Sequence, residues 1–268
     1  MSNPKIACNF HFWEKIPWRE ALDRMAETGY QGVENLMPLR EEYENRIEVG
    51  RKILEDRNLS LTGLTVQAEF AHPDRQGTIM KECLSTAGFL RDMKAEWLLL
   101  NLGSRETYIS VREDYRNLAN LLNDLGKQCS DSLVRVAVLN APGSRVEREE
   151  DIDRLLNLLD LEVVTFCPDT AGLAHAGEDP VRILKTYYEG IHHVRLQDYV
   201  PDEDHPEGGY YCPLGKGALD FTAIASALRE NQNLPWVTVS LDNQLKDAPE
   251  VAHEMYVFTD RLFGNEAM

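Results

Sequence analysis

Four side chains that can transfer protons or hold an oxyanion fall within or just after strand-like segments of this sequence. They are Glu34, Asp169, His193 and Arg195. A carboxylate or an imidazole can exchange a proton with a substrate, and a guanidinium can hold a developing oxyanion. Burial raises the pKa of a carboxyl group, and this effect makes Glu34 a candidate general base. Alternatively, Glu34 only accepts hydrogen bonds from Arg195 or His11, and His193 is a structural histidine.

The elements that position these residues alternate between two patterns. Short apolar segments rich in β-branched residues occur at 6–10, 32–37, 61–67, 97–102, 134–140, 162–169, 191–198 and 236–241. Helical periodicity occurs between them, near 18–29, 40–57, 76–95, 111–130, 148–159, 179–188, 220–231 and 247–263. Eight strand–helix pairs in 268 residues predict an α/β fold, a (β/α)8 TIM barrel, with a single domain over residues 1–268. An open doubly wound sheet is the alternative, but the turn at 11–15 lacks the glycines that such sheets use to bind phosphate.

Polar side chains gather at the predicted C-terminal ends of the strands, where barrel enzymes hold their active sites. Because side chains alternate along a strand, one set points into the barrel. From this set, and from the loops that follow, we predict six substrate-binding residues. They are His11, Gln67, Asn101, Asn140, Ser240 and Lys216. A solvated loop lysine is the alternative for Lys216, which lies in the long irregular segment 199–217.

Four stretches in the second half of the chain carry an ordered set of motifs. They are DTAGLAHAGEDPV at 169–181, IHHVRLQD at 191–198, PLGKGALDF at 213–221 and WVTVSL at 236–241. Together with GVE at 32–34, they resemble the xylose-isomerase-like TIM-barrel superfamily of sugar isomerases, epimerases and dehydratases. The resemblance covers most of the chain. It implies the same barrel and a small polyhydroxylated carbonyl compound or sugar acid as substrate.

The resemblance also implies a divalent cation, which members of this family hold with Glu, Asp, His and Glu on strands five to eight. At the matching positions this chain has Leu139, Asp169, Arg195 and Ser240. A guanidinium has no acceptor and stays protonated, so Arg195 cannot bind a cation. We therefore predict that the family's metal site is absent and that no cofactor is used. Arg195 then either holds a carboxylate or enediolate in place of the cation, or simply pairs with Asp169.

The composition bounds the partners and the compartment. Lysines and arginines number 28 against 45 aspartates and glutamates, which gives a formal net charge of −17. This charge repels phosphate backbones and anionic lipids, so we expect neither nucleic acid nor a membrane as a partner. There is no run of about 18 apolar residues and no apolar signal core. The five scattered cysteines predict free thiols, and we expect a cytoplasmic protein.

Two functional hypotheses follow from the residues and the resemblance. The leading one is an isomerase, epimerase or related lyase that acts on a keto-sugar or sugar acid through an enediolate, without the family's metal. Arg195 and nearby amides would hold the enediolate, while Glu34, His193 or Asp169 exchanges the proton. The alternative is a non-catalytic sugar- or carboxylate-binding paralogue, or a subunit of an enzyme complex. Aromatic residues at the predicted mouth contact either the ligand or a second copy of the chain. A homo-oligomer is therefore one of the alternatives.

Overall fold

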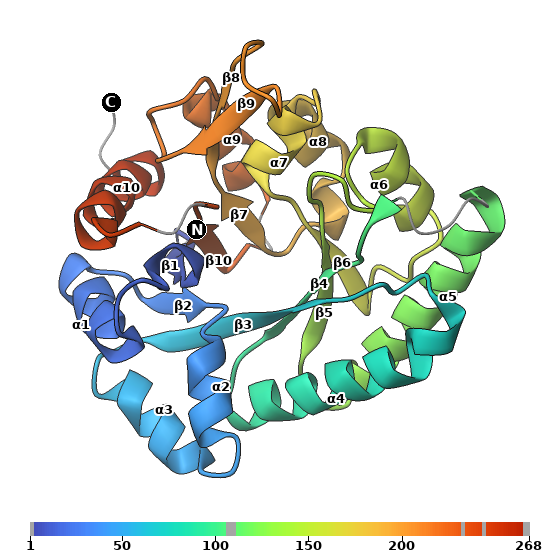
Figure 1. Cartoon of the computed structure of the whole chain (residues 1–268), viewed down its shortest axis with the longest axis horizontal. Coiled ribbons are helices and arrows are strands. Elements are labelled where there is room, and N and C mark those ends of the chain that lie inside the picture. The colour runs from blue at the N-terminus through green and yellow to red at the C-terminus, as the bar shows by residue number, and fades with distance from the viewer. Residues whose placement is uncertain (1–2, 106–110, 232–233, 243–244, 265–268) are drawn as a thin grey trace.

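The computed structural model describes residues 3–105, 111–231, 234–242 and 245–264. A sheet of eight parallel strands lies at the centre, and helices surround it (Figure 1). The strands are β1 (Lys5–Asn9), β2 (Gly32–Glu34), β3 (Ser60–Gln67), β4 (Trp97–Asn101), β5 (Arg135–Leu139), β6 (Val164–Cys167), β7 (Val194–Leu196) and β10 (Trp236–Val239). They pair in the order β6-β5-β4-β3-β2-β1-β10-β7. The predicted (β/α)8 barrel is therefore confirmed.

Two isolated bridges close the barrel between its edge strands β6 and β7. Phe166 pairs with Ile191, and Asp169 pairs with Arg195. The second bridge places the backbones of two predicted site residues side by side. On the other flank of β7, the register sets Arg195 opposite Thr238 of β10. Strands from both ends of the chain thus meet at one side of the barrel.

The helices fill the intervals between the strands. They are α1 (Trp18–Thr28), α2 (Met37–Tyr43), α3 (Ile47–Glu55), α4 (Gln76–Asp92), α5 (Val111–Ser130), α6 (Glu149–Leu156), α7 (Thr170–His175), α8 (Pro180–Thr186), α9 (Phe221–Glu230) and α10 (Ala248–Phe263). The single helix predicted over 40–57 is wrong: α2 and α3 are separate, because Arg46 has a φ of −142°, outside the helical range. Aspartates cap three helices: Asp169, Asp179 and Asp220 accept backbone N–H groups of α7, α8 and α9.

The segment after β7, predicted to be irregular, contains an antiparallel hairpin. Its strands are β8 (Asp198–Pro201) and β9 (Gly209–Cys212), and it projects at the upper edge of Figure 1. The carboxylate of Asp198 accepts the backbone N–H groups of Gly215 (3.0 Å) and Gly217 (2.8 Å). These bonds tie the returning chain to the end of β7, so the hairpin has a fixed base at the barrel mouth.

The barrel interior has an apolar half and a polar half. Trp97, Leu99, Ala137, Leu139 and Cys167 form an apolar cluster on the side of β4, β5 and β6. A separate, larger apolar core lies between the sheet and the helices. On the side of β1, β2, β7 and β10 the interior holds polar groups instead. A barrel that is structural throughout is filled with branched aliphatic residues, so the polar half marks the part that positions a site.

The structure also bears on the cysteines and on the search for membrane-spanning segments. All five cysteines are buried and unpaired. Within the described ranges, no helix has both the length and the apolar composition needed to cross a bilayer.

Candidate functional site

A cavity of about 280 Å³ opens at the C-terminal ends of the barrel strands. Amide, hydroxyl and carboxylate groups make up most of its lining. The lining residues are Asn9, His11, Asn35, Thr65, Gln67, Asn101, Leu139, Asn140, Ala141, Pro142, Asp169, Gly172, Arg195, Tyr211 and Asp242. The cavity has about the size of a small-molecule site, and its polar groups suit a ligand with many hydroxyls.

Glu34 lies beneath this cavity and is fully buried. Its Oε1 accepts hydrogen bonds from Asn9 Nδ2 (2.9 Å) and Arg195 Nε (2.6 Å). Its Oε2 accepts from Thr238 Oγ1 (3.0 Å) and lies 2.6 Å from His193 Nε2. Burial acts to raise the pKa of Glu34, but Arg195 and His193 outweigh burial and lower the pKa to about 2. The net pKa is therefore lowered, not raised as the general-base hypothesis required, and Glu34 is an ionised acceptor that does not line the cavity.

Arg195 connects the buried network to the cavity. Its Nε donates to Glu34, its Nη2 donates to Thr65 Oγ1 (2.7 Å), and 14% of its side chain is exposed. Burial acts to lower the pKa of Arg195, but the charges around it, first that of Glu34, raise the pKa. Neither of these bonds goes to Asp169. The carboxylate that the Arg195 guanidinium binds is therefore that of Glu34.

Asp169 lies just after β6, at the start of α7, and lines the cavity. Its Oδ1 accepts the Gly172 N–H (2.9 Å) at the start of α7, and its own N–H donates to Asn140 Oδ1 (2.7 Å). Burial and the charge of Asp242 raise the pKa of Asp169 from its ordinary value of 3.8 to about 7. A carboxyl group with this pKa can accept or release a proton near neutral pH.

Gln197 links the carboxylate of Asp169 to the backbone of Asp242. Its amide nitrogen donates to Asp169 Oδ2 (3.2 Å), and its oxygen accepts the backbone N–H of Asp242 (2.9 Å). The Gln197 side chain is fully buried. Asp169 and Asp242 follow β6 and β10, the two strands that flank β7, and Arg195 lies on β7 between them.

The residues present do not fit the divalent cation that the resemblance implies. Leu139 and Arg195 line the cavity at two of the four ligand positions, and neither side chain can donate an electron pair to a metal. Ser240 is buried and does not line the cavity. Across the described parts of the chain, no group of three or more His, Cys, Asp or Glu side chains is arranged to hold a metal ion.

The structure brings six of the ten predicted site residues to the cavity. They are His11, Gln67, Asn101, Asn140, Asp169 and Arg195. Glu34 and His193 lie below it, fully buried, and His193 also packs 5.4 Å from the Trp97 ring. Lys216 does not reach the cavity: it is exposed on the loop and pairs with Glu254 (3.4 Å). Ser240 is on the predicted strand but is covered by its neighbours.

Among the lining residues that sequence reasoning missed are the polar residues Asn35 and Thr65. Thr65 shares the strand face of Gln67, so the alternation that identified Gln67 also identifies Thr65. Asn35 has a φ of 61°, a conformation that asparagine tolerates better than most residues. Its Oδ1 accepts the Thr65 N–H (3.2 Å), a contact between strand ends that no local pattern indicates.

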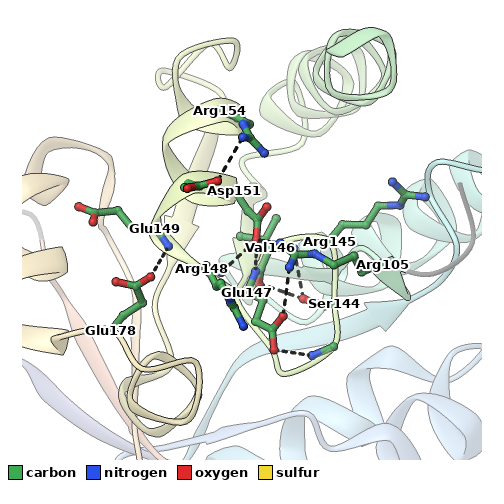
Figure 2. Close-up of polar contacts among 12 residues, drawn as sticks. Arg105, Ser144, Arg145, Val146, Glu147, Arg148, Glu149, Asp151, Arg154 and Glu178 are labelled. Carbon is green, nitrogen blue, oxygen red and sulfur yellow. Dashed lines mark hydrogen bonds and ion pairs between the residues drawn. The ribbon is translucent and has the colours of Figure 1, made fainter. Parts of the chain in front are cut away.

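The loop after β5 forms part of the rim of the cavity, and contacts of Asp151 outside the barrel hold this loop in place. Asp151, at the start of α6, pairs with Arg105 and accepts the Arg148 N–H (3.1 Å), as Figure 2 shows. The Tyr115 hydroxyl also donates to Asp151 (3.0 Å). These bonds hold residues 141–148 against the end of β4.

The fold and the site define a TIM barrel with a polar cavity at its C-terminal mouth. The family model described as xylose isomerase-like TIM barrel matches residues 22–257. The chain therefore belongs to this family.

Known relatives and solved structures agree with this assignment. Inosose dehydratase from Clostridium botulinum (strain Alaska E43 / Type E3) is 27% identical over 275 residues, which cover 93% of this chain and 89% of that protein. The crystal structure of the IOLI protein with a bound zinc atom has a TM-score of 0.82 at 18% identity and covers 98% of this chain and 100% of its own. D-psicose 3-epimerase with D-tagatose from Clostridium cellulolyticum H10 has a TM-score of 0.79 at 12% identity, covering 97% and 99%. At these identities the two structures support the fold alone.

Proposed function

We propose that this protein is a sugar-modifying enzyme, an isomerase, epimerase or related lyase that acts on a small polyhydroxylated carbonyl compound without a divalent metal. The observation that carries the proposal is that one polar cavity is lined by both Asp169 and Arg195. Asp169 has a pKa of about 7 and can exchange a proton, and the guanidinium of Arg195 can hold an oxyanion. The inosose dehydratase among the relatives supports the substrate class.

The reaction would begin with a proton transfer from the carbon next to the substrate carbonyl to the Asp169 carboxylate. The electron pair of the broken C–H bond moves toward the carbonyl oxygen, and an enediolate forms. N–H groups of Arg195 that are not used by Glu34 and Thr65 donate to this oxygen. Return of this proton to the former carbonyl carbon, while the hydroxyl proton passes to the other oxygen, would isomerise the substrate. Protonation of the original carbon from its opposite face, by an acid other than Asp169, would epimerise it. Departure of a β-hydroxyl that takes up the proton from Asp169 and leaves as water would dehydrate it. Stabilisation of such an oxyanion contributes about 3–4 kcal/mol in known enzymes.

Glu34 and His193 would act on this chemistry through Arg195. Glu34 fixes the guanidinium at Nε, and His193 holds the second oxygen of Glu34. Since both side chains are fully buried, we assign them positioning roles and assign proton exchange to Asp169.

The test is proton exchange by protein that has been treated with EDTA and dialysed. Incubation in D2O with inososes, keto-hexoses and aldonates should incorporate deuterium next to the carbonyl of at least one compound, detected by NMR. Asp169→Asn should slow the incorporation by about 10²-fold or more. Exchange that appears only after Mn²⁺, Co²⁺ or Zn²⁺ is restored would overturn the metal-free assignment.

A second candidate function is a non-catalytic binder of the same compounds. It is favoured by the replacement of three cation ligands at Leu139, Arg195 and Ser240 and by the engagement of Arg195 with Glu34. The same experiment separates the two functions. A compound that raises the melting temperature but exchanges no proton identifies a binder.

A further inference from the structure

The charge balance of the cavity carries an inference about its ligand. Of the described residues that line it, Arg195 is the only lysine or arginine, whereas Asp169 and Asp242 contribute two carboxyl groups. The other polar lining groups are mostly amides and hydroxyls, which carry no net charge. The charged side chains that line the cavity therefore give it no excess of positive charge.

The positive charge of Arg195 is also compensated from below. The Glu34 carboxylate lies 2.6 Å from Arg195 Nε, and its side chain is fully buried, so solvent does not screen the pair. The other groups bonded to Glu34 are the Asn9 amide, the Thr238 hydroxyl and the His193 imidazole, and the first two are uncharged. Glu34 thus places a full negative charge directly beside the guanidinium of Arg195, which lines the cavity.

Two basic side chains near the mouth do not restore the balance. Lys216 is exposed on its loop and pairs with Glu254. His11 lies at the rim, and its Nδ1 is 3.1 Å from a carboxylate oxygen of Glu14, three residues further along the chain. Each of them is already next to an acid.

We propose that Glu34 is a specificity-determining residue, which makes the cavity select an uncharged polyhydroxylated carbonyl compound and reject the corresponding sugar acids and sugar phosphates. This inference rests on the proposed function and narrows its substrate class. A bound carboxylate or phosphate would face two acidic side chains and a guanidinium whose charge is already compensated. The binding affinity of a neutral ligand does not depend on excess positive charge, because its hydroxyl and carbonyl oxygens need hydrogen-bond donors. The amides, Thr65 and the remaining N–H groups of Arg195 supply those donors.

The test compares binding of matched neutral and anionic probes by isothermal titration calorimetry in 10 mM buffer. The neutral probes are an inosose, D-psicose and D-tagatose, and the anionic probes are D-tagatose 6-phosphate and D-gluconate. Wild-type protein should bind at least one neutral probe about tenfold more tightly than either anion, and added salt should narrow the difference.

Glu34→Gln tests the cause of the selectivity. Glutamine keeps an acceptor for Arg195 and Asn9 but removes the compensating charge, so affinity for the anions should rise about tenfold while affinity for the neutral probe changes less than threefold. Asp242→Asn removes a charge without touching the bonds of Arg195, and should change the preference in the same direction even if Glu34→Gln folds poorly. Glu82→Gln is the matched control, because Glu82 also pairs with an arginine, Arg40 (2.7 Å), but away from the cavity.

Three outcomes would contradict the inference. Wild-type protein that prefers an anion while still exchanging protons with a substrate overturns the selectivity and leaves the proposed function standing. Unchanged anion affinity in both Glu34→Gln and Asp242→Asn overturns the role of charge. Failure of every probe, neutral or anionic, to bind or to exchange a proton overturns the inference and the proposed function together.

Discussion

Two arginine–carboxylate pairs in this barrel use the same chemistry in different surroundings. Glu34 and Arg195 lie inside the barrel, with side-chain exposures of 0% and 14%. Asp151 and Arg105 lie outside it, where the loops after β4 and β5 meet, with exposures of 2% and 44% (Figure 2). In both pairs the acid is buried, so burial alone does not distinguish a site from a structural contact.

The partners of each acid make the distinction. Asp151 accepts the backbone N–H of Arg148 at the start of α6, so its charge supports a helix and a loop. The partners of Glu34 are side chains from β1, β7 and β10, and one of them, Arg195, continues into the cavity. Asp151 therefore holds the rim loop in place, whereas Glu34, whose carboxylate binds side chains beside the cavity, orients Arg195.

The sharpest test of this comparison replaces one aspartate in each region. Asp169→Asn should lower kcat about 10²- to 10⁴-fold, because the amide cannot accept the substrate proton. Its oxygen can still accept the Gly172 N–H, so folding should be retained. Asp151→Asn should leave kcat within about twofold but lower the free energy of unfolding by about 1–3 kcal/mol, because bonds to a buried acid are weakened. Proton exchange and thermal unfolding, measured on both variants, check these outcomes.

The distinction between the two regions is wrong if Asp169→Asn and Asp151→Asn change turnover and stability in the same way. Asp169→Asn with normal turnover would remove Asp169 from proton exchange. Asp151→Asn with a large loss of kcat at normal stability would show that the rim loop takes part in the chemistry.

A second prediction concerns pH. Asp169 acts as a base only when ionised, so kcat/KM should rise with pH and level off above about 7, the pKa of this group. Because that pKa is raised in the folded state, the folded protein binds more protons than the unfolded chain between about pH 4 and 7, and the contribution of Asp169 to stability falls as the pH rises through this range. Asp242→Asn removes a charge that raises the pKa, so the kcat/KM profile should move to lower pH. An unmoved profile would show that Asp242 does not act on Asp169.

The fold was predictable because its signals are local and repeated. Eight apolar segments alternating with helical periodicity sufficed for the barrel, and the inward parity of the strands identified Gln67, Asn101 and Asp169 as cavity residues. The hairpin of β8 and β9 was not predicted, since its segment is rich in glycine and proline and carries no strand pattern.

The roles inside the site were less predictable than its location. Depth along the barrel axis decides whether an inward side chain meets ligand or protein, and strand alternation does not encode depth. Glu34 shows the consequence: its sequence context indicates burial, which raises a carboxyl pKa, but Arg195 and His193 reach it from β7 and lower the pKa to about 2. Contacts of this kind join residues about 160 positions apart in sequence.

The smallest expected effect tests how firmly Arg195 must be held. Thr65→Val removes the acceptor of Arg195 Nη2 while Glu34 still binds Nε. One hydrogen bond contributes about 1 kcal/mol, so kcat/KM should fall about fivefold. Thr62→Val is the matched control on the same strand, because the Thr62 hydroxyl bonds the Val33 carbonyl (3.2 Å) and does not contact Arg195.

Comparison of the two threonine variants separates orientation from stability. Thr62→Val should lower the melting temperature and keep kcat/KM, whereas Thr65→Val should lower kcat/KM beyond any change in melting temperature. Equal kinetic losses would mean that β3 acts through general stability. A loss confined to Thr65→Val would mean that both anchors of the guanidinium, Glu34 from below and Thr65 from the side, are needed to direct it at the substrate.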